Sequence, residues 1–169
     1  MQIHSLRDIM RVQGFEFRLS EALRDRLPHS LAIHFLLKRW PVGVHGWNGD
    51  VASTYAVVPG SHHGVPPSAG ALHDVPARAE LLGEGQQWTT AQAELARYAI
   101  ELAAAQDDLV VWSGKPLSSS AQVLATAVAI VADWLASDSA NFPYLDASST
   151  EDRVGTAWHR LNLTPAFAG

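Results

Sequence analysis

The sequence contains no cysteine. This absence excludes a disulfide framework, a thiolate zinc site and catalysis by a thiol. The side chains left to bind a transition metal are histidine, aspartate and glutamate, and the chain has 8 histidines. An excess of positive charge is also lacking, because 12 Lys and Arg stand against 17 Asp and Glu, for a net charge of −5. A protein that grips duplex phosphates with a basic surface is therefore not expected, although bound cations would reverse the charge of a metal-lined pocket.

Long hydrophobic runs are scarce as well. The longest, Val123 to Ala136, contains Asp133 and is short for a membrane span. The residues from Met1 to Gly14 are polar and amphipathic and do not resemble a signal peptide. We therefore expect a cytoplasmic protein that does not enter the membrane. A length of 169 residues with 47% hydrophobic residues fits a single globular domain over 1–169.

Helix signals dominate the chain, and we expect an all-α domain without internal repeats. Thr89 with Gln92, and Ser119 with Gln122, form capping-box patterns that predict two helix starts, the second helix running to Ala136. Helical spacing predicts further helices over Ile3–Val12, Arg18–Arg26, His29–Trp40, Asp50–Val58 and Thr150–Leu161. Asp108–Trp112 has the character of a strand but is too short to build a sheet.

The most informative stretch is Pro59-Gly-Ser-His-His-Gly-Val-Pro-Pro67. Two adjacent histidines, His62 and His63, lie between glycines at which the backbone can turn sharply and approach a ligand. Neighbouring side chains diverge, so we expect the pair to reach two metals, or one metal and a scissile phosphate. Taken alone, a His-His dipeptide is more often an exposed loop with two incidental histidines.

Asp133 and His29 are the next candidates. Asp133 lies in a helix that is apolar nearly all round and is therefore expected to be buried. A buried carboxylate costs several kcal/mol unless it is paired, hydrogen-bonded or metal-bound, so a metal ligand and a partner of a helix terminus or an Arg are equally good interpretations. His29 follows Pro28 at a predicted helix start, and His34 points to a different face of that helix. For either histidine alone, a core or surface role is the better interpretation.

His73-Asp74 is interpreted as a surface pair, with Asp74 capping a helix before Val75-Pro76. Ser113-Gly-Lys-Pro116 resembles the end of a phosphate-binding loop but lacks the upstream glycine and the Ser or Thr that would bind magnesium. We interpret it as a turn.

The order of these signals resembles the HD nuclease domain of the CRISPR-associated type I nuclease-helicase family. That family has a lone His, then a "GHHG" loop followed by proline, then an "ADW-aliphatic-AS" helix followed by "FP". The matching pieces here are His29, Gly60–Pro67, Ala132–Asp138 and Phe142-Pro-Tyr144. The segment from Arg153 to Leu163 is similar to the stretch before the family's helicase domain, so the resemblance spans essentially the whole chain.

The resemblance implies an HD-domain-like helical bundle with a site for a divalent transition metal (Fe, Mn, Ni, Co or Zn). Its metal ligands would be His29, His62, His63 and Asp133, with His62, His63 and Asp133 catalytic in cutting single-stranded DNA. The three histidines would crowd one metal and Asp133 would serve a second. Ser137 and Asp138 would orient these ligands. Trp134 is expected to pack in the core rather than to stack on a base.

The sequence departs from the family at its beginning. The family opens with a His and then a His-Asp pair in "HDIGK"-like sequence, whereas this chain begins at the following "FQ" point, as Met1-Gln2. We therefore expect the back two-thirds of the domain, truncated at the N-terminus and without a helicase domain. His4 and Asp8 lie at the wrong place to replace the missing pair. Without the bridging Asp two metals are not assembled, but three imidazoles can hold one ion with open positions.

Three hypotheses follow for function. One is an enzyme with an incomplete site, giving weak or no metal-dependent nuclease activity. The second is a binding or regulatory protein, an adaptor or inhibitor that docks on the CRISPR surveillance complex. The third is a gene fragment or a mis-called start codon. Because loss of the first helices would expose apolar surface, we also expect a homodimer or a rearranged N-terminus over Ile3–Phe17.

Overall fold

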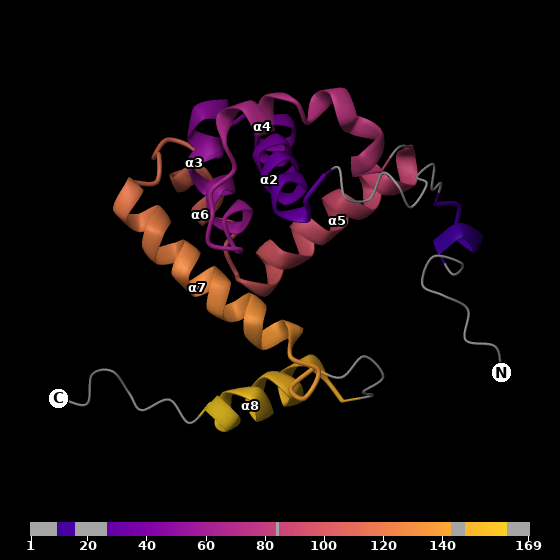
Figure 1. Cartoon of the computed structure of the whole chain (residues 1–169), viewed down its shortest axis with the longest axis vertical. Helices are drawn as coiled ribbons and strands as arrows, with labels where there is room; N and C mark the ends of the chain where they lie inside the picture. The colour runs from indigo at the N-terminus through magenta and orange to yellow at the C-terminus, as the bar shows by residue number, and fades with distance from the viewer. Residues whose placement is uncertain (1–9, 16–26, 84, 143–147, 162–169) are drawn as a thin grey trace.

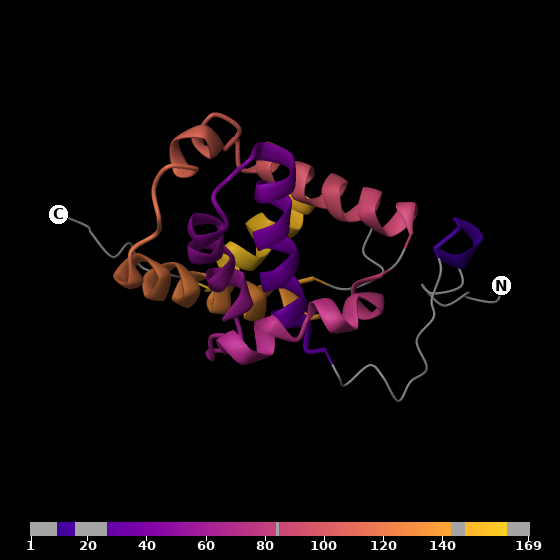
Figure 2. The ribbon, with the colours of Figure 1, turned by 90° about the horizontal axis from the view of Figure 1, so that it is seen from above.

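The computed structural model describes residues 10–15, 27–83, 85–142 and 148–161. Throughout these residues the regular structure is helical, which confirms the all-α prediction (Figure 1). The elements are α2 (His29–His45), α3 (Gly49–Gly60), α4 (Ala69–His73), the 3₁₀ helix η2 (Pro76–Leu82), α5 (Gln86–Leu102), α6 (Asp108–Trp112), α7 (Ser119–Ser137) and α8 (Thr150–Leu161). Helices α2 and α3 pack together, and α7 packs against α3 (Figure 2).

Helix α2 begins at His29, as predicted. Pro28 precedes it in an extended conformation, with ψ 137°. The helix continues past the predicted end at Trp40 because Pro41 is accommodated inside it, with its ring buried. It ends at Gly46, whose φ of 67° is left-handed and whose N–H donates to the Pro41 carbonyl.

Helix α3 packs on α2 through small residues. Ala52, Ala56 and Gly60 are its buried residues and lie four apart, so they form one stripe along the helix. Small side chains there let the two helix axes approach closely. The predicted range Asp50–Val58 lies inside the observed one. The Asn48 side chain caps the start by accepting from the N–H groups of Asp50 and Val51, at 2.8 and 3.3 Å.

Replacing this cap is expected to destabilise the protein modestly. Asn48→Ala leaves two N–H groups of the first turn without their acceptor, which costs about 1 kcal/mol of the free energy of unfolding. Asn48→Asp keeps the acceptor and should stay near the parent value. Urea denaturation followed by circular dichroism measures both. Equal losses in the two variants would show that the cap does not stabilise α3.

The main hydrophobic cluster lies under the start of α2. Its buried members are Leu27, Leu31 and Val75, and Phe35 and Leu72 are among the apolar residues packed against them. Val75 connects α4 to η2, two short elements that the sequence patterns did not predict. This cluster fixes the end of α2 that carries His29.

Both capping-box predictions are wrong in register. Helix α5 begins at Gln86 rather than at Thr89, and Thr89 lies inside it with its hydroxyl donating to the Gly85 carbonyl. In α7 the residue that caps is Ser118, which accepts from the N–H of Ala121. The strand-like Asp108–Trp112 forms α6, a helix of 5 residues. The range predicted for α8 agrees with the structure.

Helix α7 is not buried as predicted. None of its residues is buried within the part of the chain that the structure describes, Asp133 is half-buried, and Trp134 is 71% exposed rather than packed in a core. The helix covers α3 with one face only. With 19 residues and a mean hydropathy of 1.4 it is also long and apolar enough to span a membrane, by length and composition alone. The helix is therefore longer than its apolar run, and a helix of a globular domain can meet the same criterion.

Several predictions fall outside the described residues. They are most of the helix over 3–12, the helix over 18–26, the positions of His4 and Asp8, the rearranged N-terminus, and the Pro-Tyr of the Phe142-Pro-Tyr144 segment.

Candidate metal centre

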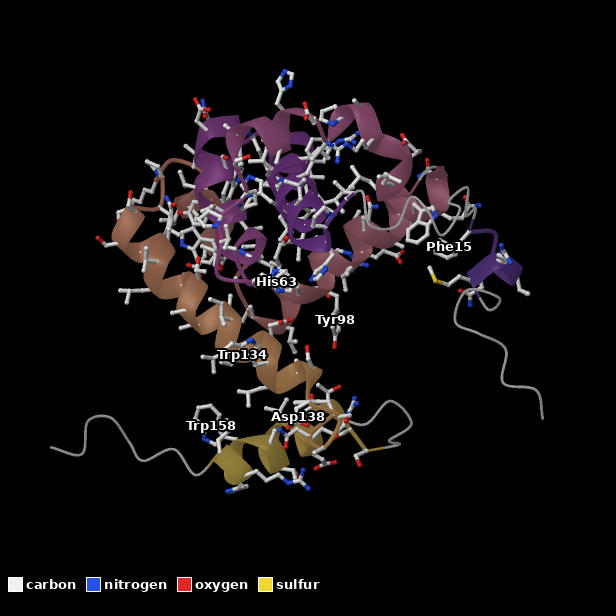
Figure 3. The ribbon with its side chains drawn as sticks, viewed as in Figure 1. Phe15, His63, Tyr98, Trp134, Asp138 and Trp158 are labelled. Atoms are coloured by element: carbon white, nitrogen blue, oxygen red, sulfur yellow. The ribbon has the colours of Figure 1, made fainter. Side chains whose placement is uncertain are left out.

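Three of the predicted site residues meet at the lower end of the α2–α3 pair. His29 is the first residue of α2, and His62 and His63 lie in the turn that follows α3. The Nε2 atom of His29 lies 2.8 Å from Nε2 of His62 and 2.9 Å from Nε2 of His63. The three candidate ligand atoms all lie within 4.8 Å of one another. Figure 3 labels His63 in the space between the ribbons of α5 and α7.

The turn after α3 is held by several backbone hydrogen bonds. The N–H of Ser61 donates to the Val58 carbonyl at 3.1 Å, and the Ser61 hydroxyl donates to the Val57 carbonyl at 2.6 Å. The N–H of Gly64 donates to the Ser61 carbonyl at 2.7 Å, and Gly64 has a left-handed φ of 84°. A side chain at position 64 would strain this conformation, so glycine closes the turn. The expectation that the side chains of His62 and His63 diverge is wrong, since the turn directs both rings toward His29.

The tautomer of His62 follows from its partner. Its Nδ1 lies 2.5 Å from the Pro59 carbonyl, which is an acceptor only, so Nδ1 carries the hydrogen and donates. In the neutral ring Nε2 is then a bare lone pair, directed at His29. A backbone carbonyl that orients an imidazole in this way is the usual support of a histidine metal ligand.

The three Nε2 atoms of the cluster cannot all be satisfied by hydrogen bonds to one another. The single Nε2 of His29 faces two other Nε2 atoms, yet a neutral ring nitrogen donates one hydrogen or accepts one. At least one of the two contacts therefore lacks a well-aligned hydrogen bond. A cation would accept lone pairs from all three rings at once, and His29, His62 and His63 are the residues that would hold it. The donor set fits a transition ion with open positions, because imidazole suits these metals and His63 is exposed.

Electrostatics keep His29 in the form that binds metal. Its pKa lies below the ordinary value of 6.5 because partial removal from water disfavours the charged ring. The charges of His63 and His62 lower the pKa further, while the carboxylate of Asp133 opposes them. His29 is therefore a neutral imidazole at neutral pH, with a lone pair to donate.

Asp133 lies close enough to act on His29 but is not a member of the three-histidine cluster. Helix α7 is brought to this side of the molecule by the loop before it. The N–H of Leu117 donates to the Thr54 hydroxyl at 2.9 Å, and the Tyr55 hydroxyl donates to the Lys115 carbonyl at 2.7 Å. A ligand role for Asp133 stays a prediction.

Neither Ser137 nor Asp138 joins the imidazoles in the way their predicted orienting role requires. Asp138 accepts from the N–H of Ala140 and from the Asn141 side chain, at 2.9 and 3.0 Å, in the turn that ends α7 (Figure 3). Its carboxylate stabilises this turn. His73 and Asp74 are exposed surface residues, as predicted, and Asp74 caps the C-terminus of α4.

His34 lies in the core, one of the two roles that the sequence favoured for it, although the sequence did not single it out as a residue of the site. It is 2% exposed, and neither ring nitrogen has a hydrogen-bond partner among the residues that the structure describes. Burial lowers the pKa of His34, and the nearby charge of Lys38 lowers it further. Its position five residues after His29 gave no sign that it would face α3.

Comparisons with known proteins agree with this geometry. The family model described as "Cas3, HD domain" matches residues 1–142. The crystal structure of the Thermus thermophilus cas3 HD domain in the presence of Ni²⁺ is similar, with 28% sequence identity and a TM-score of 0.54. The match covers 85% of this chain and 60% of that one, so this chain spans less than two-thirds of the related structure. No curated protein sequence matches the chain.

Proposed function

The chain belongs to the family of Cas3 HD domains, and on that premise we propose that it binds one divalent transition ion through His29, His62 and His63. The observation that carries the proposal is the convergence of three imidazole nitrogens within 4.8 Å. Helix α2 supplies one ligand and the turn after α3 supplies two. We further propose a role on or near single-stranded DNA in CRISPR interference, in the cytoplasm, with weak or no nuclease activity.

The argument for weak chemistry rests on the donor set. When bound, a transition ion would polarise a phosphodiester and lower the pKa of water. The chain itself supplies three imidazoles, and Asp133 is the carboxylate whose charge reaches His29. Asp133 is therefore the residue placed to hold a proton near the site. With one ion in place of two, hydrolysis should be slower by orders of magnitude.

A second candidate function is that of a binding or regulatory protein without catalysis. It is favoured by the apolar face of α7, where Val123, Leu124, Val128 and Trp134 are 69–71% exposed. Contiguous apolar surface of this kind marks an interaction site. The partner would be a second copy of the chain or a component of the surveillance complex, and we do not propose a membrane.

The first experiment is the metal content of the purified protein, with the double variant His62→Ala/His63→Ala alongside. We expect near-stoichiometric transition metal in the parent and almost none in the double variant, because two of three ligands are removed. The matched control is His73→Ala, whose side chain is 90% exposed and lies outside the cluster. It should retain the metal.

Metal binding in the parent would be followed by a cleavage assay on single-stranded DNA with the parent and Asp133→Asn. Cleavage that is lost in Asp133→Asn would support the enzyme. Stoichiometric metal without cleavage would support the binding protein with a residual site. Absence of metal from the parent after incubation with Ni²⁺, Mn²⁺, Fe²⁺, Co²⁺ and Zn²⁺ would overturn the metal site.

A further inference from the structure

The ring of His34 fills the space beside Gly60, the last residue of α3. A Cβ built on Gly60 would lie 2.7 Å from the Cβ of His34 and 2.9 Å from its Nδ1. Distances below 3.0 Å essentially never occur between real side chains, so no residue larger than glycine fits unless the helices move. Both residues are buried. The φ of Gly60 is not left-handed, so it is the close approach of His34, rather than backbone conformation, that requires glycine here.

This contact lies between the two parts of the metal centre. His34 follows His29 by five residues on the rigid helix α2, while Gly60 precedes His62 by two residues. The turn from Gly60 to His62 is short and closed by hydrogen bonds, among them the N–H of His62 to the Pro59 carbonyl at 3.3 Å. A displacement of Gly60 relative to His34 is therefore passed directly to the position of His62 relative to His29.

His34 contributes to this contact by shape rather than by hydrogen bonding. Its two ring nitrogens are buried and make no hydrogen bond within the described part of the chain. Burying two ring nitrogens without hydrogen bonds lowers the free energy of unfolding, and an apolar side chain would not have this cost. What His34 supplies is bulk, because its Cβ and ring atoms occupy the space that a side chain at position 60 would need.

We propose that His34 is a positioning residue for the metal centre: its ring, seated on Gly60, sets the distance at which the His62–His63 turn faces His29. The inference rests on the proposed metal site and names a residue outside it. The ring acts as a spacer between α2 and α3. Removing it lets the helices shift, and adding a methyl group at Gly60 forces them apart.

The test is a double-mutant cycle on the full chain, with His34→Ala, Gly60→Ala and the combined variant. Ni²⁺ affinity is measured by calorimetry, and the geometry of the site is followed by the visible absorption spectrum of bound Co²⁺. Supporting groups around a metal site affect affinity by about 10–100-fold. We expect roughly tenfold weaker binding in His34→Ala and at least that in Gly60→Ala, each with an altered Co²⁺ spectrum.

The combined variant is the decisive one. An added Cβ at position 60 would meet the His34 ring at 2.9 Å and the His34 Cβ at 2.7 Å, and His34→Ala removes only the ring, so the effect of Gly60→Ala should shrink in the combined variant without vanishing. The double variant should then bind Ni²⁺ more tightly than the product of the two single losses predicts, whereas independent effects would multiply. Gly43→Ala is the matched control, since Gly43 lies in α2 with nothing within 4 Å of an added Cβ, and its affinity should be unchanged.

The outcomes separate the two proposals. If the parent binds no Ni²⁺, both the metal site and the spacer role of His34 are overturned. If the parent binds Ni²⁺ and folded His34→Ala binds it equally well with an unchanged Co²⁺ spectrum, only the spacer role is overturned. Multiplicative losses in the double variant would overturn it too. Should Gly60→Ala fail to fold, His34→Ala still decides the question, because it introduces no clash.

Discussion

Nickel present at one hundred times its Kd is expected to raise the free energy of unfolding by about 2.7 kcal/mol. The reason is that the ligand cluster exists only in the folded chain. His29 and His62 are separated by 33 positions in the sequence and are brought to 2.8 Å by the packing of α3 on α2. An ion that binds the folded state and not the unfolded one stabilises the folded state by mass action.

For a chain of this length, stabilisation of that size corresponds to an increase in Tm of roughly 5–10 °C. Thermal unfolding followed by circular dichroism, with and without Ni²⁺, measures it, and excess chelator should reverse it. His62→Ala/His63→Ala should show almost no increase, and His73→Ala should show the full one. An increase of the same size in the double variant would place the stabilising ion elsewhere.

The sequence predicted which residues form this centre, but not how they meet. The order of His29, the His62–His63 pair and Asp133 identified the candidates through the family resemblance. Adjacent side chains were expected to diverge, because that is the behaviour of an extended or helical backbone. The turn closed by Ser61 and Gly64 has neither conformation, and its hydrogen bonds bring both rings to one point.

The sequence patterns predicted the wrong helix start where two starts fitted the pattern equally well. Thr89 and Gln92 have the spacing of a capping box, yet the helix starts earlier, and the Gln92 side chain instead donates to the Leu82 carbonyl at 2.7 Å. The five residues Asp108–Trp112 show that a short apolar run does not distinguish strand from helix. The predicted helix starts that agree with the structure are those of α2 and α8. Pro28 precedes α2, and α8 has Glu151 and Asp152 in its first turn, so local chemistry favours a single start in each.

The exposure of α7 could not be predicted from its apolar pattern either. An apolar helix indicates that something covers it, but the pattern does not say whether the same chain supplies the cover. In the structure one face lies on α3, while Val123, Leu124 and Trp134 on the opposite side are mostly exposed. Asp133 is half-buried, so the free-energy cost of desolvating its carboxylate is smaller than for a fully buried one. A bound metal or hydrogen-bond partner is therefore not required.

The protein is expected to lose stability as the pH falls below about 6.5, and His34 is the main cause. Burial and the charge of Lys38 hold the pKa of His34 below its ordinary value of 6.5 in the folded state. Between the folded and unfolded pKa values, the unfolded chain binds one more proton at this residue than the folded chain does. The free energy of unfolding therefore rises with pH through this window and is fully present above it.

The slope for one such proton approaches about 1.4 kcal/mol per pH unit at its steepest. His29 acts in the same direction, since its pKa is also lowered, but it is exposed and its share should be small. The measurement is urea denaturation at intervals from pH 8 down to pH 5, in chelator, on the parent and on His34→Leu. Leucine fills a similar volume without a titratable group.

His34→Leu should remove most of the slope, and His29→Ala should leave most of it in place. The comparison isolates the His34 ring, because His34→Leu removes this titratable group and leaves the seven other histidines in place. A slope that persists unchanged in His34→Leu would mean that His34 is not held neutral by burial. Its ring would then be reached by solvent, contrary to its 2% exposure and to the lack of a hydrogen-bond partner for either nitrogen in the described part of the chain.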